Sequence, residues 1–249
     1  MSRPKPPLAF ENNEFLKSRD ARILRIISEY IEPDKRLKNL NIRNTIVFFG
    51  SARIKENKND PMSKYYWAAE EFAFQLASWS KELRKDSNDF YICTGGGPGI
   101  MEAANRGARR ASEPTIGFNI SLPFEQHPNE YISDSLNFEF HYFYMRKLWF
   151  LYHAKTLVVF PGGFGTLDEL FETLTLIQTN KIEKGHIPVL LYDEKWWKKI
   201  INFQQFVDDG LISSEDMSLF KFFNSPEEGM SILKPRLTEV IETVKRSVV

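Results

Sequence analysis

Short apolar runs rich in β-branched and aromatic residues alternate with longer segments of helical periodicity along most of this chain. The apolar runs lie at 45–49, 90–93, 115–120, 138–140, 156–160 and 187–192, and the helical patterns at 63–83, 99–111, 142–153, 167–179 and 195–207. Nearly continuous apolar strands separated by amphipathic helices indicate a parallel sheet covered on both faces. We therefore predict an α/β fold with a Rossmann-like, doubly wound parallel sheet, followed by a closing helix over 226–247.

Residues 1–43 precede the first predicted strand and form an N-terminal helical extension. Ile23, Leu24, Ile27 and Ile31 recur at helical spacing, and Pro33 is expected to end that helix. The helix either packs on the main domain, which is the interpretation we favour, or serves as a lid or partner helix. No repeat, low-complexity tract or Ser/Gly linker divides the remaining residues. We expect residues 44–249 to form one catalytic domain.

The charge balance and the apolar runs narrow the expected partners and location. Lys plus Arg and Asp plus Glu both number 33, so the formal net charge is zero. This balance gives no reason to expect binding to nucleic acid or to an anionic membrane. No signal peptide is recognisable, and no run approaches the roughly 20 apolar residues of a membrane span. We expect a soluble, cytoplasmic protein.

The single cysteine and the four histidines give no sign of a metal site. Cys93 cannot form an intramolecular disulfide, and its apolar neighbours favour a small buried side chain over a nucleophile. The histidines show no metal-binding spacing; they are His127, His141, His153 and His186. We expect neither a metal nor another cofactor.

Three predicted strands end in glycine turns, at 50–53 (GSAR), 94–99 (TGGGPG) and 161–166 (PGGFGT). The last two lead directly into predicted helices, whose first N–H groups have no intrahelical partner and attract phosphate. Glycine also lets a ligand approach the backbone closely. Neither loop carries the lysine of a Walker A motif or the full dinucleotide-binding fingerprint. The loops therefore predict phosphate binding without a dinucleotide cofactor.

Three segments together resemble the Lonely Guy (LOG) family: 95–103 (GGGPGIMEA), 144–147 (YMRK) and 161–169 (PGGFGTLDE). The similarity extends from about residue 46 to residue 192 and includes 119–126 (NISLPFEQ). LOG proteins are cytokinin riboside 5′-monophosphate phosphoribohydrolases, long mislabelled as lysine decarboxylases. The resemblance implies a Rossmann-like sheet and a homodimer. The extension is similar to longer bacterial members, which include enzymes acting on AMP or other nucleotides.

The resemblance also implies which residues form the site. Arg146 and Glu169 match the catalytic pair of the family, and Lys147 matches the accompanying basic residue. Thr166 and its glycine loop match the phosphate-binding segment. The predicted phosphate- and nucleotide-binding residues are Gly50, Ser51, Arg53, Gly95, Gly96, Gly97, Met101, Lys147, Gly162, Gly163, Gly165 and Thr166.

Cleavage of an N-glycosidic bond develops positive charge on the ribose, which a nearby carboxylate can stabilise while activating water. Glu169 is expected on the first turn of the helix after Gly165, close to phosphate donors; alternatively, it completes a capping box with Thr166. Arg146 can hold a phosphate or ribose oxygen, orient Glu169, or lie on a solvated helix face. Asp168 is expected to interact with the helix dipole. The residues alone leave these alternatives open.

Two other functions compete with hydrolysis. A pyridoxal-phosphate decarboxylase needs a lysine for a Schiff base, and nothing marks Lys155 as that residue. A non-catalytic nucleotide or cofactor carrier needs no pair such as Arg146 and Glu169. We therefore expect a nucleoside 5′-monophosphate N-glycosidase that releases a purine-type base, adenine or a cytokinin, and ribose 5-phosphate.

Overall fold

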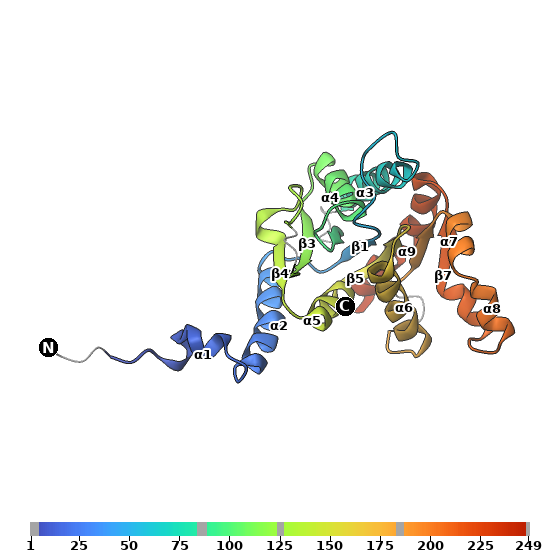
Figure 1. Ribbon diagram of the computed structural model, residues 1–249. Helices are drawn as coiled ribbons and strands as arrows, with labels where there is room; N and C mark the ends of the chain where they lie inside the picture. The colour runs from blue at the N-terminus through green and yellow to red at the C-terminus, as the bar shows by residue number, and fades with distance from the viewer. Residues whose placement is uncertain (1–4, 84–88, 124–126, 183–186, 248–249) are drawn as a thin grey trace.

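The computed structural model describes residues 5–83, 89–123, 127–182 and 187–247, the last seven by their backbone alone. Its strands form one seven-stranded sheet in the order β4-β3-β2-β1-β5-β6-β7, and every pairing is parallel (Figure 1). The strands are β1 Thr45–Phe49, β2 Tyr91–Thr94, β3 Thr115–Ile120, β4 Asn137–Phe140, β5 Ala154–Val159, β6 Val189–Tyr192 and β7 Phe220–Phe223. The predicted α/β class with a Rossmann-like parallel sheet is confirmed.

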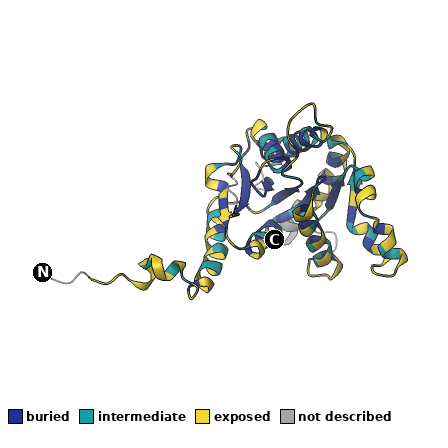
Figure 2. Cartoon of the chain, viewed as in Figure 1, coloured by how far each residue is buried: buried dark blue, intermediate teal, exposed yellow. Residues whose placement is uncertain are grey.

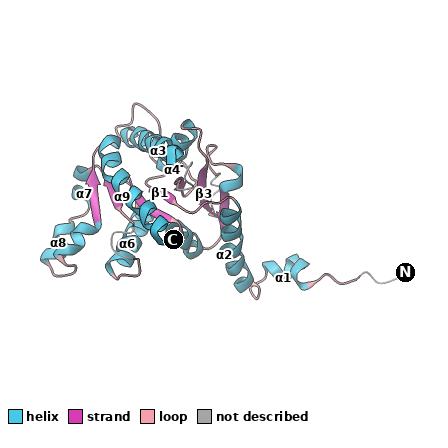
Figure 3. Ribbon diagram, turned by 180° about the vertical axis from the view of Figure 1, so that it is seen from behind, coloured by secondary structure: helices cyan, strands magenta, loops and turns pink. Residues whose placement is uncertain are grey.

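The two faces of the sheet carry separate layers of helices. Ile46 and Phe48 of β1 pack in the cluster under α3 Ser63–Leu83, α4 Ile100–Arg110 and α9 Pro226–Ser247. Val47 and Phe49 pack in the opposite cluster, under α5 Phe143–Tyr152 and α6 Phe164–Gln178. Both sides of the strands are therefore buried, as Figure 2 shows in dark blue, and Figure 3 shows the layers from behind. Burial on both faces explains why the strands read as continuous apolar runs.

The C-terminal third differs from the prediction in its strands and helices. The sheet has a further edge strand, β7, which the apolar pattern did not reveal because it is short and carries the exposed Lys221. The predicted helix over 195–207 is two helices, α7 Glu194–Ile200 and α8 Phe203–Asp208. Asn202 separates them because its side chain accepts a hydrogen bond from the backbone N–H of Gln205 (3.3 Å) and caps α8.

The N-terminal extension is tied to the main domain through α2 Arg22–Asn39. The prediction that Pro33 ends this helix is wrong, since α2 continues through it. Proline lacks the N–H that the Glu29 carbonyl would otherwise receive, and that carbonyl accepts a hydrogen bond from Trp149 Nε1 instead (2.9 Å). Leu37 lies fully buried in the core, so α2 packs on the domain, as favoured. A short helix, α1 Asn13–Lys17, precedes α2 and contributes no buried residue.

The order of the strands identifies where a ligand can bind. From β1 the chain moves outward through β2, β3 and β4, and then returns to place β5 on the other side of β1. The connections after β1 and β5 thus leave in opposite directions, which opens a crevice at the carboxyl ends of the strands. The three glycine turns follow β1, β2 and β5, so all of them lie at this edge.

Candidate active site

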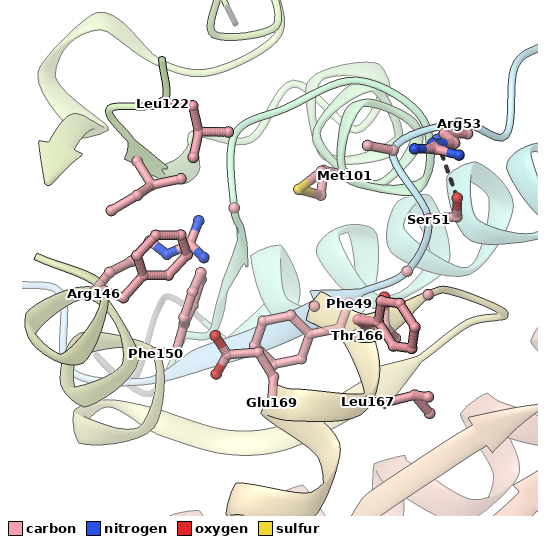
Figure 4. A pocket seen from close by; sticks show the side chains of 18 residues that line it. Phe49, Ser51, Arg53, Met101, Leu122, Arg146, Phe150, Thr166, Leu167 and Glu169 are labelled. Atoms are coloured by element: carbon pink, nitrogen blue, oxygen red, sulfur yellow. Dashed lines mark hydrogen bonds between the residues drawn. The ribbon is translucent and has the colours of Figure 1, made fainter. Parts of the chain in front are cut away.

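A cavity of about 590 Å³ opens at the carboxyl edge of β1, β2 and β5 (Figure 4). Ten of the predicted site residues line it: Gly50, Ser51, Arg53, Gly95, Met101, Arg146, Gly163, Gly165, Thr166 and Glu169. They come from the three glycine loops and from the helices α4, α5 and α6. The crevice predicted by the topology is therefore the place where these residues meet.

Backbone hydrogen bonds join the three loops into one surface. The Ser51 N–H donates to the carbonyl of Pro161 (3.0 Å), which links the first loop to the third. The Ile100 N–H donates to the carbonyl of Ser51 (3.1 Å), which links the second loop to the first. Within the first loop, Ser51 Oγ accepts from the N–H of Arg53 (3.1 Å; Figure 4). These bonds fix the spacing of the cavity walls.

The start of α6 presents donors to the cavity. The helix begins at Phe164 with Gly163 as its N-cap, and no side chain caps it. The first N–H groups of a helix have no intrahelical partner, and the residues that carry them here, Phe164, Gly165 and Thr166, line the cavity. Together with the helix dipole, they form a site suited to an anion.

This start corrects the expected position of Glu169. Because α6 begins at Phe164, three residues before the predicted helix over 167–179, Glu169 lies on its second turn rather than its first. A capping box between Thr166 and Glu169 is excluded, since the N-cap is Gly163. The Glu169 carboxylate points instead toward the side of the cavity where Arg146 and Phe150 lie (Figure 4).

The Glu169 side chain is a buried acid with a strongly shifted pKa. The residue is 5% exposed. Burial raises the pKa of Glu169 to about 7, although the cations of Lys147 and Arg146 act in the opposite direction. Such a carboxyl exchanges a proton near neutral pH, as a general acid or base must.

Arg146 supplies a cation with unused hydrogen-bonding capacity. Its guanidinium lies 5.1 Å from the ring centroid of Phe143 and 5.5 Å from that of Phe150. Burial lowers the pKa of Arg146, and the carboxylate of Glu169 is the largest influence that raises it. The Nε is buried, and no described residue accepts a hydrogen bond from it. The solvated helix face considered above is therefore excluded, and a ligand oxygen can satisfy this donor.

Lys147 lies outside the cavity lining and joins two helices. Its Nζ is 2.8 Å from Asp168 Oδ2 and 2.8 Å from Glu172 Oε2. Burial alone would lower the pKa of Lys147, but the hydrogen bonds to these carboxylates raise it. Lys147 follows Arg146 and Asp168 precedes Glu169, so this contact holds the two helices that carry the central pair.

Three predicted glycines, Gly96, Gly97 and Gly162, also lie outside the lining. Gly96 has a φ of +74°, and an added Cβ would lie 2.0 Å from Asn119 Oδ1. Asn129 Nδ2 donates to the carbonyls of Gly96 and Gly97 at 3.0 Å each. The second glycine loop is thus packed against protein, and only Gly95 and Met101 bring it to the cavity.

The sequence analysis missed most of the apolar wall. These lining residues are Phe49, Ala52, Ile120, Leu122, Phe143, Phe150, Phe164 and Leu167. Most sit at strand ends or on amphipathic helices, where the pattern cannot distinguish a cavity wall from core. Phe164 had a signal in the sequence, because it stands inside the third glycine motif. In the structure its side chain is 93% exposed.

Several other predicted features lie away from the cavity. Cys93 is confirmed as a buried side chain, and burial raises the pKa of its thiol. His127, His141 and His153 do not line the cavity, while His186 and the segment 124–126 lie outside the described residues. Across the described ranges, no group of three His, Cys, Asp or Glu residues could hold a metal ion. No described helix is long and apolar enough to cross a membrane.

Comparison with known proteins identifies the family. Residues 101–233 match the family described as "Possible lysine decarboxylase", and the chain belongs to it. The chain is similar to the cytokinin riboside 5′-monophosphate phosphoribohydrolase LOG3 of Arabidopsis thaliana, with 26% identity over 184 residues, 71% of this chain and 75% of the relative. The predicted relationship to the LOG family is confirmed.

Two solved structures share the fold. The X-ray structure of TM1055 has a TM-score of 0.55 and 23% identity, and the match covers 77% of this chain and 99% of that one. The molybdenum cofactor binding protein of Rippkaea orientalis has a TM-score of 0.50 and 19% identity, covering 78% and 96%. The same architecture therefore occurs in a protein that is named for binding the molybdenum cofactor.

Proposed function

We propose that this protein hydrolyses the N-glycosidic bond of a nucleoside 5′-monophosphate, releasing a purine-type base, adenine or a cytokinin, and ribose 5-phosphate. The observation that carries the proposal is the buried Glu169 carboxyl, with a pKa of about 7, facing the same cavity as Arg146 and the uncapped start of α6. The acid can act on the reacting ribose, the helix start can bind the phosphate, and the cation can hold a ligand oxygen.

The proposed pose follows from the chemistry of the cavity walls. The phosphate accepts hydrogen bonds from the first N–H groups of α6, with the hydroxyl groups of Thr166 and Ser51 nearby. The ribose then lies next to Glu169, which is one helical turn beyond the phosphate donors. The base lies against apolar side chains such as Ile120, Leu122 and Phe143.

In the proposed reaction, a water oxygen bonds to C1′ while the bond between C1′ and the base nitrogen breaks. The bonding electrons leave with the base, and positive charge develops on the ribose. The ionised Glu169 stabilises this charge and takes a proton from the attacking water. The departing base gains a proton, so the water molecule supplies the hydroxyl group on C1′ of ribose 5-phosphate and, in net terms, the proton on the base. Arg146 holds a ligand oxygen and keeps its charge throughout, since guanidinium does not deprotonate in proteins.

A pyridoxal-phosphate decarboxylase fits the cavity poorly. Such an enzyme needs a lysine that can reach the cofactor, and none of the described lining residues is a lysine. Lys155 lies near the amino end of β5, at the edge of the sheet opposite the glycine loops. The remaining alternative is a carrier, which would bind a nucleotide or cofactor without turning it over.

The experiment that tests the proposal is an assay of base release. The purified protein is incubated with AMP, GMP, CMP, UMP and isopentenyl-AMP, and with adenosine as the substrate that lacks phosphate. Free base and ribose 5-phosphate are then separated by chromatography. We expect release from a purine monophosphate and none from adenosine. Tight binding without release from any of them would overturn hydrolysis and establish the carrier alternative.

A further inference from the structure

Another cavity, of about 660 Å³, lies where the connection that follows the first glycine loop enters α3. Its volume falls within the range of small-molecule pockets, about 300–1,000 Å³. None of its lining residues lines the candidate active site. This cavity is called the α3 pocket below, and its wall consists of Lys58, Asp60, Pro61, Ser63, Lys64 and Trp67.

Ser63 brings an unused hydroxyl group to the α3 pocket. The residue is only 6% exposed, and it lines the pocket. Its backbone N–H donates to the carbonyl of Asp60 (2.9 Å), but within the described ranges its side-chain hydroxyl has no hydrogen-bond partner. Buried hydroxyl groups normally have one. A ligand in the pocket can supply the missing partner.

The charges of the wall favour an anion. Lys58 is exposed and forms no ion pair with the described residues. Lys64 Nζ lies 3.2 Å from Asp193 Oδ2, and the Lys64 side chain remains 62% exposed. Asp60 is the only acidic residue among the six, and its Oδ1 accepts a hydrogen bond from the backbone N–H of Met62 (2.8 Å). The positive end of the α3 dipole adds to the two lysines.

Trp67 adds a flat aromatic surface to the same wall. Its ring packs edge to face with that of Tyr66, with the centroids 5.4 Å apart. The guanidinium of Arg106 lies 5.5 Å from the centroid of the Trp67 ring. These contacts hold the indole in place, and an indole at the wall of a cavity can stack on a planar base. A nucleotide has both of the groups that the pocket suits, a phosphate and a base.

We propose that the α3 pocket is a second binding site for a nucleotide, separate from the site of the proposed reaction. The phosphate contacts Lys58 and the hydroxyl of Ser63, and the base stacks on Trp67. One connection serves both sites, because residues 50–53 line the candidate active site and the wall of the α3 pocket begins at residue 58. The inference does not depend on hydrolysis, since the two sites share no lining residue.

Equilibrium dialysis with labelled AMP tests the proposal. The full-length Glu169→Gln protein is used, so that hydrolysis is slow, and two AMP molecules are expected per chain. Adding Lys58→Glu places an anion beside the bound phosphate, so the affinity of one site should fall at least about tenfold. Lys55→Glu is the matched control, because it makes the same charge change at an exposed residue of the same connection, outside both walls.

Two further variants test the two halves of the ligand separately. Ser63→Ala removes the hydroxyl, so binding of AMP and of ribose 5-phosphate to the α3 pocket should each weaken by about tenfold. Trp67→Leu should weaken AMP by about tenfold and leave ribose 5-phosphate unchanged, because that ligand has no base. Circular dichroism and thermal unfolding establish that each variant is folded.

An AMP count that Lys58→Glu leaves unchanged overturns the site, as do equal losses in Lys58→Glu and Lys55→Glu. Equal weakening of AMP and ribose 5-phosphate by Trp67→Leu overturns the choice of a nucleotide. Base release by the wild type is measured separately. Should the proposed function fail and the active site leave AMP unbound, one AMP per chain remains, and its loss in Lys58→Glu still supports the α3 pocket.

Discussion

The two glycine-rich turns that lead into helices look alike in sequence but differ in their surroundings. The turn before α4 is buried, and Asn119, Asn129 and the first glycine loop fill the space around it. The turn before α6 is open: a Cβ added at Gly163 or Gly165 would meet nothing within 4 Å. Packing thus requires glycine at Gly96 and Gly99 in the first turn. In the second turn packing requires it at Gly162, where an added Cβ would lie 2.1 Å from Thr166 Oγ1, while Gly163 and Gly165 leave room for a ligand.

The helices after the turns differ in the same sense, and each carries a glutamate near its start. Glu102 on α4 accepts a hydrogen bond from the hydroxyl of Tyr66 (2.8 Å) and does not line the cavity. Glu169 on α6 lines the cavity, and burial raises its pKa to about 7. One helix start supports the fold, and the other supports the proposed chemistry. Four measurements test this difference between the two helix starts.

The largest effect is expected from exchanging the two glutamates for glutamine. Glu169→Gln removes the proposed charge and proton acceptor, so kcat should fall by about 10²–10⁴-fold. Glu102→Gln should leave kcat within about threefold, because that side chain acts in packing. Steady-state assays of base release measure both. Similar losses in the two variants would abolish the distinction between the helix starts.

Alanine in place of a glycine should separate the two turns by stability. Gly96→Ala forces a positive φ and a contact with Asn119, so the free energy of unfolding should fall by about 2–5 kcal/mol. Gly165→Ala lies within α6 in open space and should raise it by about 0.5–1 kcal/mol. Urea unfolding followed by circular dichroism gives both values. A neutral Gly96→Ala would contradict the packed turn.

The pKa of Glu169 predicts how stability depends on pH. The folded protein keeps this proton up to about pH 7, whereas an ordinary glutamate loses it near 4.5. As pH rises through this window, the free energy of unfolding should therefore fall, on the order of 3 kcal/mol from this group. Glu169→Gln should remove that decrease, and turnover of the wild type should rise through the same window as the carboxylate forms. Parallel pH profiles of stability in the two proteins would show that Glu169 is not the buried acid.

The smallest effect is expected on substrate affinity at the open turn. The methyl group of Gly165→Ala enters the space where the phosphate is proposed to bind, so KM should rise about tenfold. Because Glu169 and Arg146 are untouched, kcat should change much less. Gly210→Ala is no suitable control, since Gly210 has a positive φ; Ser231→Ala on the exposed side of α9 serves instead. A tenfold change in kcat with KM constant would place the phosphate elsewhere.

The sequence predicted the sheet because its strands are buried on both faces, so they read as short runs rich in β-branched and aromatic residues, such as Thr45–Phe49. It also predicted Arg146 and Glu169, but through motif resemblance rather than through periodicity. It could not separate Gly96 from Gly165, since the contact with Asn119 depends on how β3 lies beside β2. Nor could it foresee that Pro33 lies within α2, because the compensating donor, Trp149, is more than a hundred residues away.

That compensation means the extension cannot be treated as a removable tail. The Glu29 carboxylate accepts hydrogen bonds from the backbone N–H groups of His141 (2.8 Å) and Tyr142 (3.2 Å), where α5 begins. A chain shortened to start at residue 44 would remove the protein acceptors of both amides and of the Trp149 indole, at the helix that carries Arg146. A chimera that joins this domain to another protein, or that replaces its N-terminal extension with that of a relative, therefore needs to keep α2 together with the domain.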